Sequence, residues 1–132
     1  MQQTSLIVWV ALLLSQAVYV GISVFWAPES STSPVTPAFV SALFLVSVAT
    51  GSGAHFFWRR SQAAQEEQPE SENRGAPGSV FANQIIAWVL DESVAIYGVV
   101  LAFLGFEAAT WGLFSVMALA LMLLHRPSKP AA

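Results

Sequence analysis

The stretch TSLIVWVALLLSQAVYVGISVFW, residues 4–26, decides the class of fold, because it holds no acidic or basic side chain along its whole length. The hydrocarbon core of a bilayer is about 30 Å thick, and a helix needs about 20 apolar residues to cross it. The stretch also lacks the basic n-region of a signal peptide, and its apolar run is longer than a signal peptide requires. It therefore predicts a retained transmembrane helix.

The composition of the whole chain agrees with a membrane protein. Of its 132 residues, 55% are hydrophobic and only 10% are charged, too few charges for the surface of a soluble domain of this size. We expect one all-α integral membrane domain over residues 1–132, with four transmembrane helices arranged as two antiparallel hairpins. The predicted helices cover residues 4–26, 37–58, 80–104 and 107–125. Residues 61–79 are rich in Gln, Glu, Ser, Pro and Gly and predict a flexible loop.

The basic residues predict the orientation of the chain in the membrane. All of them lie in the central loop or near the C-terminus, at Arg59, Arg60, Arg74, Arg126 and Lys129. Loops rich in Lys and Arg stay on the cytoplasmic side of a membrane. With an even number of spans, we therefore expect both termini and residues 61–79 in the cytoplasm, and the protein in a bacterial-type inner (plasma) membrane.

Two adjacent acids, Asp91 and Glu92, lie in the middle of the third predicted helix. Glu92 is about 18 Å from Val80 at 1.5 Å per residue, close to the centre of a bilayer. Ionisable residues at this depth are costly and mark a functional site by default. Since burial disfavours the charged form and the two acids repel each other, we expect at least one of them to carry a proton at neutral pH.

Helical geometry places the two acids on different faces. Asp91 shares its stripe with small residues, which suits a contact with another helix of the same chain; these are Ala95, Gly98, Ala102 and Gly105. Glu92 shares its stripe with the bulky residues Trp88, Ile96, Val99 and Phe103, a face suited to lipid or to a neighbouring subunit. Ser93, Tyr97 and Gln16 can supply further oxygens, so the predicted ion-binding residues are Glu92, Asp91, Ser93, Tyr97 and Gln16.

A weak internal repeat links the first and third helices. LLLSQAVYVG in the first resembles WVLDESVAIYG in the third, so that Ser15, Gln16 and Tyr19 correspond loosely to Asp91, Glu92 and Tyr97. This pattern suggests two hairpins in parallel orientation, as in membrane proteins built from duplicated halves. Apolar helices also resemble one another by chance, and the sequence does not decide between these explanations.

The stretch ESVAIYGVVLAFLG, Glu92 to Gly105, resembles the carboxylate helix of the proteolipid c subunit of rotary ATPases. The resemblance implies that Glu92 is an ion-binding carboxylate, helped by Ser93 and Tyr97 as in the sodium-binding members. It covers one helix, and the preceding SVATGSGAHFF lacks the family's sustained glycine repeat. Taken whole, with SQ in the first helix and MLLHRP near the end, the chain resembles small uncharacterised four-helix bacterial membrane proteins.

We therefore expect a multi-pass membrane subunit that binds or relays a proton or a monovalent cation at a mid-membrane carboxylate. The alternative is a non-transporting packing or assembly protein whose polar residues hold helices together. The expected partners are the lipid bilayer and either further copies of the chain or other membrane subunits. The chain has no cysteine and only two histidines, and it has no basic patch. We expect no cofactor, no metal, no nucleic acid and no enzymatic activity.

Overall fold

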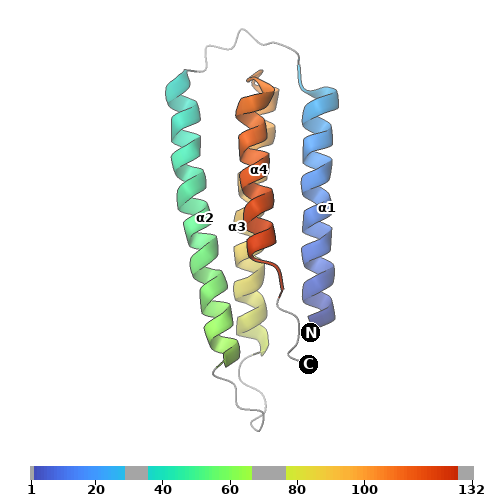
Figure 1. The fold of residues 1–132 in the computed structure, drawn as a ribbon, viewed down its shortest axis with the longest axis vertical. Helices are drawn as coiled ribbons and strands as arrows, with labels where there is room; N and C mark the ends of the chain where they lie inside the picture. Colours follow the sequence, from blue (N-terminus) through green and yellow to red (C-terminus); the bar gives the residue numbers. More distant parts are fainter. Residues whose placement is uncertain (1, 29–35, 67–76, 128–132) are drawn as a thin grey trace.

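The computed structural model describes residues 2–28, 36–66 and 77–127, and within them the chain is all-helical, as predicted. The helices are α1 (Gln2–Trp26), α2 (Pro37–Glu66), α3 (Pro77–Phe103) and α4 (Ala108–Leu124). The first three are long and apolar enough to cross a membrane, whereas α4 is a shorter apolar helix of 17 residues. Successive helices run in opposite directions, so the start of α1 and the end of α4 point toward the same end of the bundle (Figure 1).

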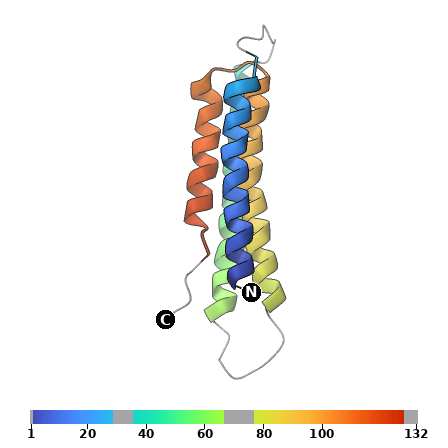
Figure 2. The same ribbon diagram turned by 90° about the vertical axis from the view of Figure 1, so that its right-hand side faces the viewer.

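The central helix of the bundle is α3, which contacts each of the other three. It packs against α4, and α1 and α2 lie on opposite sides of this pair (Figures 1 and 2). Among the described residues, the backbones of α1 and α2 do not come close to each other. The predicted hairpin of α3 and α4 is therefore closely packed. The helices of the other predicted hairpin, α1 and α2, are antiparallel, but the pair of α3 and α4 lies between them.

Two helix boundaries differ by more than two residues from those expected. α2 continues to Glu66 instead of ending at residue 58, and α3 begins at Pro77 instead of residue 80. The prediction ended this helix just before Arg59 and Arg60, but arginine is a good helix former, and the Gln, Ala and Glu residues that follow also favour a helix. Proline is well tolerated in the first turn of a helix. The remainder of the expected loop, residues 67–76, lies outside the described residues.

Gly105 sets the tight connection between α3 and α4. Its φ of 81° lies in the left-handed region, which glycine adopts without a steric penalty. The amide of Gly105 donates to Ala102 O (3.0 Å) and that of Phe106 to Leu101 O (3.1 Å), the paired bonds of a Schellman motif. Glu107 is the N-cap residue of α4, and its backbone carbonyl accepts from the amides of Thr110 (2.9 Å) and Trp111 (3.2 Å). This connection holds α3 and α4 together as an antiparallel pair.

The two helices of this pair pack tightly at Gly98, on the small-residue stripe that shares its face with Asp91. A Cβ atom at Gly98 would lie 3.0 Å from the carbonyl oxygen of Trp111 and 3.3 Å from Phe114 Cβ. Ala95 and Ala102 on the same stripe are buried. The expectation that the Asp91 face of α3 packs against another helix of the chain is confirmed.

We expect Gly98→Leu to lower the midpoint of thermal unfolding, followed by circular dichroism in detergent micelles. The side chain would have to push α4 away, and overpacking of this kind costs about 1–3 kcal/mol or more. The matched control is Gly21→Leu, since a Cβ at Gly21 meets nothing within 4 Å. An equal effect of both substitutions would contradict the close packing of α3 on α4.

Candidate functional site: a buried carboxylate and histidine cluster

The polar residues of α3 lie between two apolar clusters of the bundle. One cluster is built around Trp58 and Trp88, and the other around Val94, Leu101 and Phe114. On α3, Asp91 and Glu92 fall between Trp88 and Val94 in the chain. Both acids are buried, with 0% and 7% of their surface exposed. Burial of this kind is costly for a carboxyl group unless it has partners.

Asp91 has a histidine partner that the sequence alone did not indicate. Its Oδ2 atom lies 2.8 Å from Nδ1 of His125, the residue that follows α4, and the His125 side chain is also fully buried. The other ring nitrogen of His125, Nε2, lies 3.4 Å from Nδ1 of His55 on α2. A chain of polar atoms therefore runs from α3 through the end of α4 to α2.

His55 forms the accessible end of this chain. It is exposed and lines a groove of about 670 Å³ between α2 and α4, together with Ser52, Gly51 and Leu121. Asp91 and His125, in contrast, are enclosed by the bundle. An imidazole can accept a proton on one nitrogen and release it from the other, so this arrangement can connect a buried carboxyl to the surface.

The position of His125 depends on the way in which the end of α4 is buried. The last carbonyls of a helix have no partner within it, and in an apolar interior they need one. The indole Nε1 of Trp9 donates to Met122 O (2.9 Å), and that of Trp88 donates to His125 O (2.7 Å). The ring of Trp58 also lies beside that of His125, with 5.7 Å between centroids. α1, α2 and α3 thus all contact this end of α4.

Glu92 points toward α1, and the expectation that it faces lipid or another subunit is wrong. Ser15 of α1 donates a hydrogen bond from its hydroxyl to Glu92 Oε1. The hydroxyl of Tyr19, one turn further along α1, also interacts with the Glu92 carboxyl group and with Ser15. The stripe prediction failed because α1 packs against this part of α3. Of the bulky residues that share the stripe with Glu92, Trp88 is buried, whereas Ile96 and Phe103 are exposed.

Each acid keeps one oxygen without a partner. Asp91 Oδ1 and Glu92 Oε2 are buried, and neither has a hydrogen-bonding partner in the described part of the chain. Buried polar atoms are normally paired, and an exception needs an explanation. An oxygen atom without a hydrogen bond can bind a proton or a cation. These two oxygen atoms are therefore the positions of the cluster at which a proton or a cation can bind.

Two predicted site residues do not join Glu92. Ser93 donates its hydroxyl to Val89 O within α3 (2.9 Å), and Tyr97 is partly buried against the apolar cluster of Phe114. The reason is helical geometry, since Ser93 is turned about 100° from Glu92 and Tyr97 about 140°. The hydroxyls that do meet Glu92 are those of Ser15 and Tyr19, on α1.

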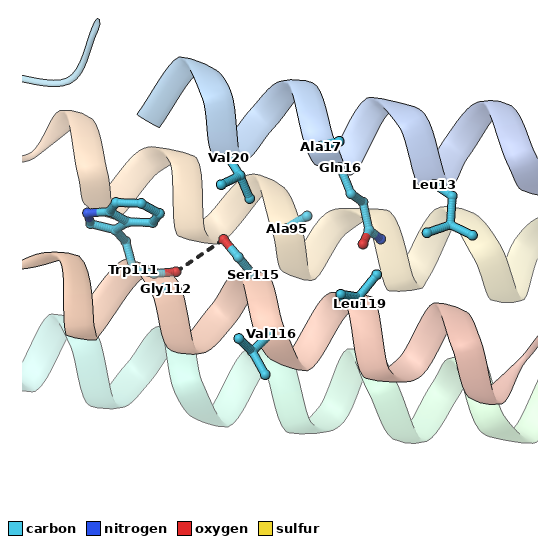
Figure 3. A pocket seen from close by; sticks show the side chains of 10 residues that line it. All are labelled: Leu13, Gln16, Ala17, Val20, Ala95, Trp111, Gly112, Ser115, Val116 and Leu119. Atoms are coloured by element: carbon cyan, nitrogen blue, oxygen red, sulfur yellow. Dashed lines mark hydrogen bonds between the residues drawn. The ribbon is translucent and has the colours of Figure 1, made fainter. Parts of the chain in front are cut away.

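Gln16, the fifth predicted residue, also lies away from Glu92. Ser15 faces α3, and Gln16, one position later, turns toward α4 instead. Figure 3 shows its amide in the groove between α1 and α4, opposite Leu119. Neither its Oε1 nor its Nε2 has a hydrogen-bonding partner in the region described. The structure therefore separates Gln16 from the cluster around the acids.

Sequence reasoning missed four residues of the cluster, namely Ser15, Tyr19, His55 and His125. The weak match between the first and third helices singled out Ser15 and Tyr19, but it did not show that they meet Glu92. The two histidines had only their rarity as a signal, because each falls near the end of an apolar run, where a single interfacial hydrogen bond explains a histidine.

We expect Trp88→Phe to destabilise the protein by about 1–3 kcal/mol, because His125 O would be left buried without its donor. Trp26→Phe is the matched control, since the Trp26 side chain is 73% exposed. Thermal unfolding followed by circular dichroism in detergent measures both. An unchanged midpoint for Trp88→Phe would mean that the indole hydrogen bond does not hold the end of α4.

Comparison with protein-family models, with curated proteins and with solved structures finds no match to this chain. The resemblance of residues 92–105 to the proteolipid helix therefore stays a prediction. The carboxylate and histidine cluster is interpreted from its own geometry.

Proposed function

We propose that this protein crosses a membrane four times and takes up and releases a proton through a buried network centred on Asp91. His125 links Asp91 to His55, where protons enter and leave. Glu92, with the hydroxyls of Ser15 and Tyr19, is a second carboxyl at which a proton or a monovalent cation can bind. The observation that carries the proposal is the continuous chain of polar atoms from a fully buried carboxyl to an exposed imidazole.

The dimensions of the helices are compatible with four spans. α4 is about 25 Å long at 1.5 Å per residue, slightly less than the roughly 30 Å of a hydrocarbon core, and α2 and α3 are longer than that core. Asp91 lies about 18 Å from Phe103, deep in the hydrocarbon region if the connection between α3 and α4 is at the outer surface. His55, one turn before Arg59, would then be near the inner interface.

The electrostatics of the cluster also support proton uptake. An isolated carboxylate in a membrane interior costs at least a few kcal/mol, and a nearby imidazole offsets part of this cost by donating a hydrogen bond or by becoming positively charged. One proton can be placed on Asp91 or on His125 with little movement, because their atoms are already at hydrogen-bonding distance. Such a pair can change its protonation without a large rearrangement of helices.

A second candidate function is helix assembly without transport, which the attachment of α1 favours. α1 is joined to the rest of the bundle by several polar contacts, including Ser5 Oγ to Gln84 Oε1 (3.2 Å) and Trp9 Nε1 to Met122 O. In a membrane, where apolar surfaces gain little by associating, polar contacts of this kind hold helices together. In this reading, Asp91 and Glu92 keep a constant protonation state.

The two functions predict different infrared spectra. Proton uptake predicts a protonated-carboxyl C=O band in the reconstituted protein that weakens as the pH rises and that is reduced in Asp91→Asn or Glu92→Gln. Added sodium would weaken the Glu92 part of the band only if that site binds the cation. The substitutions also separate these bands from those of the other acids, such as Glu29 and Glu107. A difference spectrum independent of pH would support the assembly function and contradict proton uptake.

The path through His55 predicts a kinetic effect. After a rapid pH change, followed with a soluble indicator dye, we expect His55→Gln to take up protons at Asp91 more slowly than the natural protein. The number of protons bound at Asp91 should stay the same, because His55 is the route and not the final site. Ser52→Ala is the matched control, since Ser52 lines the same groove but lies outside the polar chain. Equal rates in all three proteins would exclude His55 as the entry point.

A further inference from the structure

A further groove lies on the opposite side of α4, where the amide of Gln16 has no hydrogen-bonding partner in the part of the chain that the structure describes. The Gln16 side chain is only 5% exposed, and both its donor and its acceptor are buried without a hydrogen bond in the described chain. A buried polar group left unpaired destabilises a protein, because it loses its hydrogen bonds to water without gaining others. Replacement by an apolar residue would avoid this cost, so an unpaired amide here indicates a ligand that pairs with it.

The space in front of Gln16 has the properties of a small-molecule site. It is a groove of about 360 Å³ between α1 and α4, within the range of about 300–1,000 Å³ that is common for ligand pockets. Its walls are almost entirely apolar, with Leu13 and Val20 on one side and Val116 and Leu119 on the other (Figure 3). These residues are partly or fully exposed, so the groove opens toward the surface that lipid would cover.

The groove also has unfilled room on its α4 side. A Cβ atom added at Gly112 would meet nothing within 4 Å. Ala17 and Ala95 also have small side chains and leave space beside Gln16. A narrow alkyl chain fits a passage lined by small and aliphatic residues, whereas the buried position of the amide makes it inaccessible to the broad face of another helix.

The hydrogen-bonding groups of Gln16 select the head group of the ligand. A primary amide presents an N–H donor and a carbonyl acceptor side by side, and a protonated carboxylic acid presents the complementary pair. The acid O–H would donate to Oε1, and Nε2–H would donate to the acid carbonyl. An ester or a ketone only accepts, which leaves Oε1 unpaired, and an ionised carboxylate would bring a charge into an apolar groove.

We propose that the groove between α1 and α4 binds a single-chain fatty acid in its protonated form, with the acid paired to the Gln16 amide and the alkyl chain along the apolar walls. This site is separate from the network of Asp91, His125 and His55, and it does not depend on proton uptake there. None of the residues that line the groove is acidic, basic or a histidine, so the pH dependence of binding would come from the ligand.

The test uses the full-length protein in neutral detergent and a brominated fatty acid, ω-bromododecanoic acid, with its methyl ester for comparison. Bromine quenches tryptophan fluorescence at short range, and Trp111 lines the groove. We expect saturable quenching by the acid that strengthens as the pH is lowered, and that is reduced in Trp111→Phe. The ester should bind about tenfold more weakly, since it forms one hydrogen bond fewer with the amide and leaves Oε1 unpaired.

Three variants complete the test. Gln16→Leu should lower the affinity for the acid to that for the ester, and Gly112→Leu should abolish saturable quenching by filling the groove. Gly21→Leu is the matched control and should bind as the natural protein does, because the added side chain lies outside the groove. Circular dichroism verifies that each variant is folded.

Equal binding of acid and ester by the natural protein would overturn the proposal, and this comparison requires no variant. Unchanged acid binding in Gln16→Leu or in Gly112→Leu would overturn it as well. Asp91→Asn should keep the full affinity for the fatty acid, so failure of this proposal and failure of the proton-uptake proposal are distinguishable.

Discussion

The arrangement of this protein depends on the burial of the C-terminal end of α4. This helix is shorter than the two that flank it, and at its end the carbonyls of Met122 and His125, two buried residues, meet indoles of α1 and α3 inside the bundle. Unpaired carbonyls in an apolar interior are costly, and Trp9 and Trp88 supply the missing donors. The same constraint fixes His125 directly after the helix, beside Asp91. Structural capping and the candidate site therefore use the same few residues.

The two adjacent acids have different surroundings because α3 is in contact with every other helix. Asp91 faces α4 along a stripe of small residues, and its partner is an imidazole, a group that can gain a positive charge. Glu92 faces α1, and its partners are uncharged hydroxyl groups. A carboxyl beside a histidine can exchange a proton through the histidine, while a carboxyl among hydroxyls has oxygens suited to a proton or a cation. Neighbouring positions in the chain thus provide two chemically distinct sites.

The grooves on the two sides of α4 also differ in their polarity. The groove shared with α2 contains His55 and the hydroxyl groups of Ser47 and Ser52, and it leads to the polar chain that ends at Asp91. The groove shared with α1 is apolar except for Gln16 and Ser115, and it leads to the Gln16 amide, which has no hydrogen-bonding partner among the described residues. The first suits an ion that moves between water and the interior. The second suits an apolar molecule with a single polar group.

The sequence by itself determined the all-helical architecture, the approximate bounds of the helices and the packing of the Asp91 stripe, because apolar length and a period of 3.6 residues are local properties. It also indicated that Asp91 and Glu92 are the unusual residues of the chain. Only the tertiary structure decided their partners. Ser15 and Tyr19 meet Glu92, and His125 and His55 meet Asp91, across long separations in the chain. Those pairs depend on which helices are neighbours and on how each helix is rotated about its axis. A helix that is apolar on nearly all of its faces does not determine its neighbours or its rotation by its sequence alone.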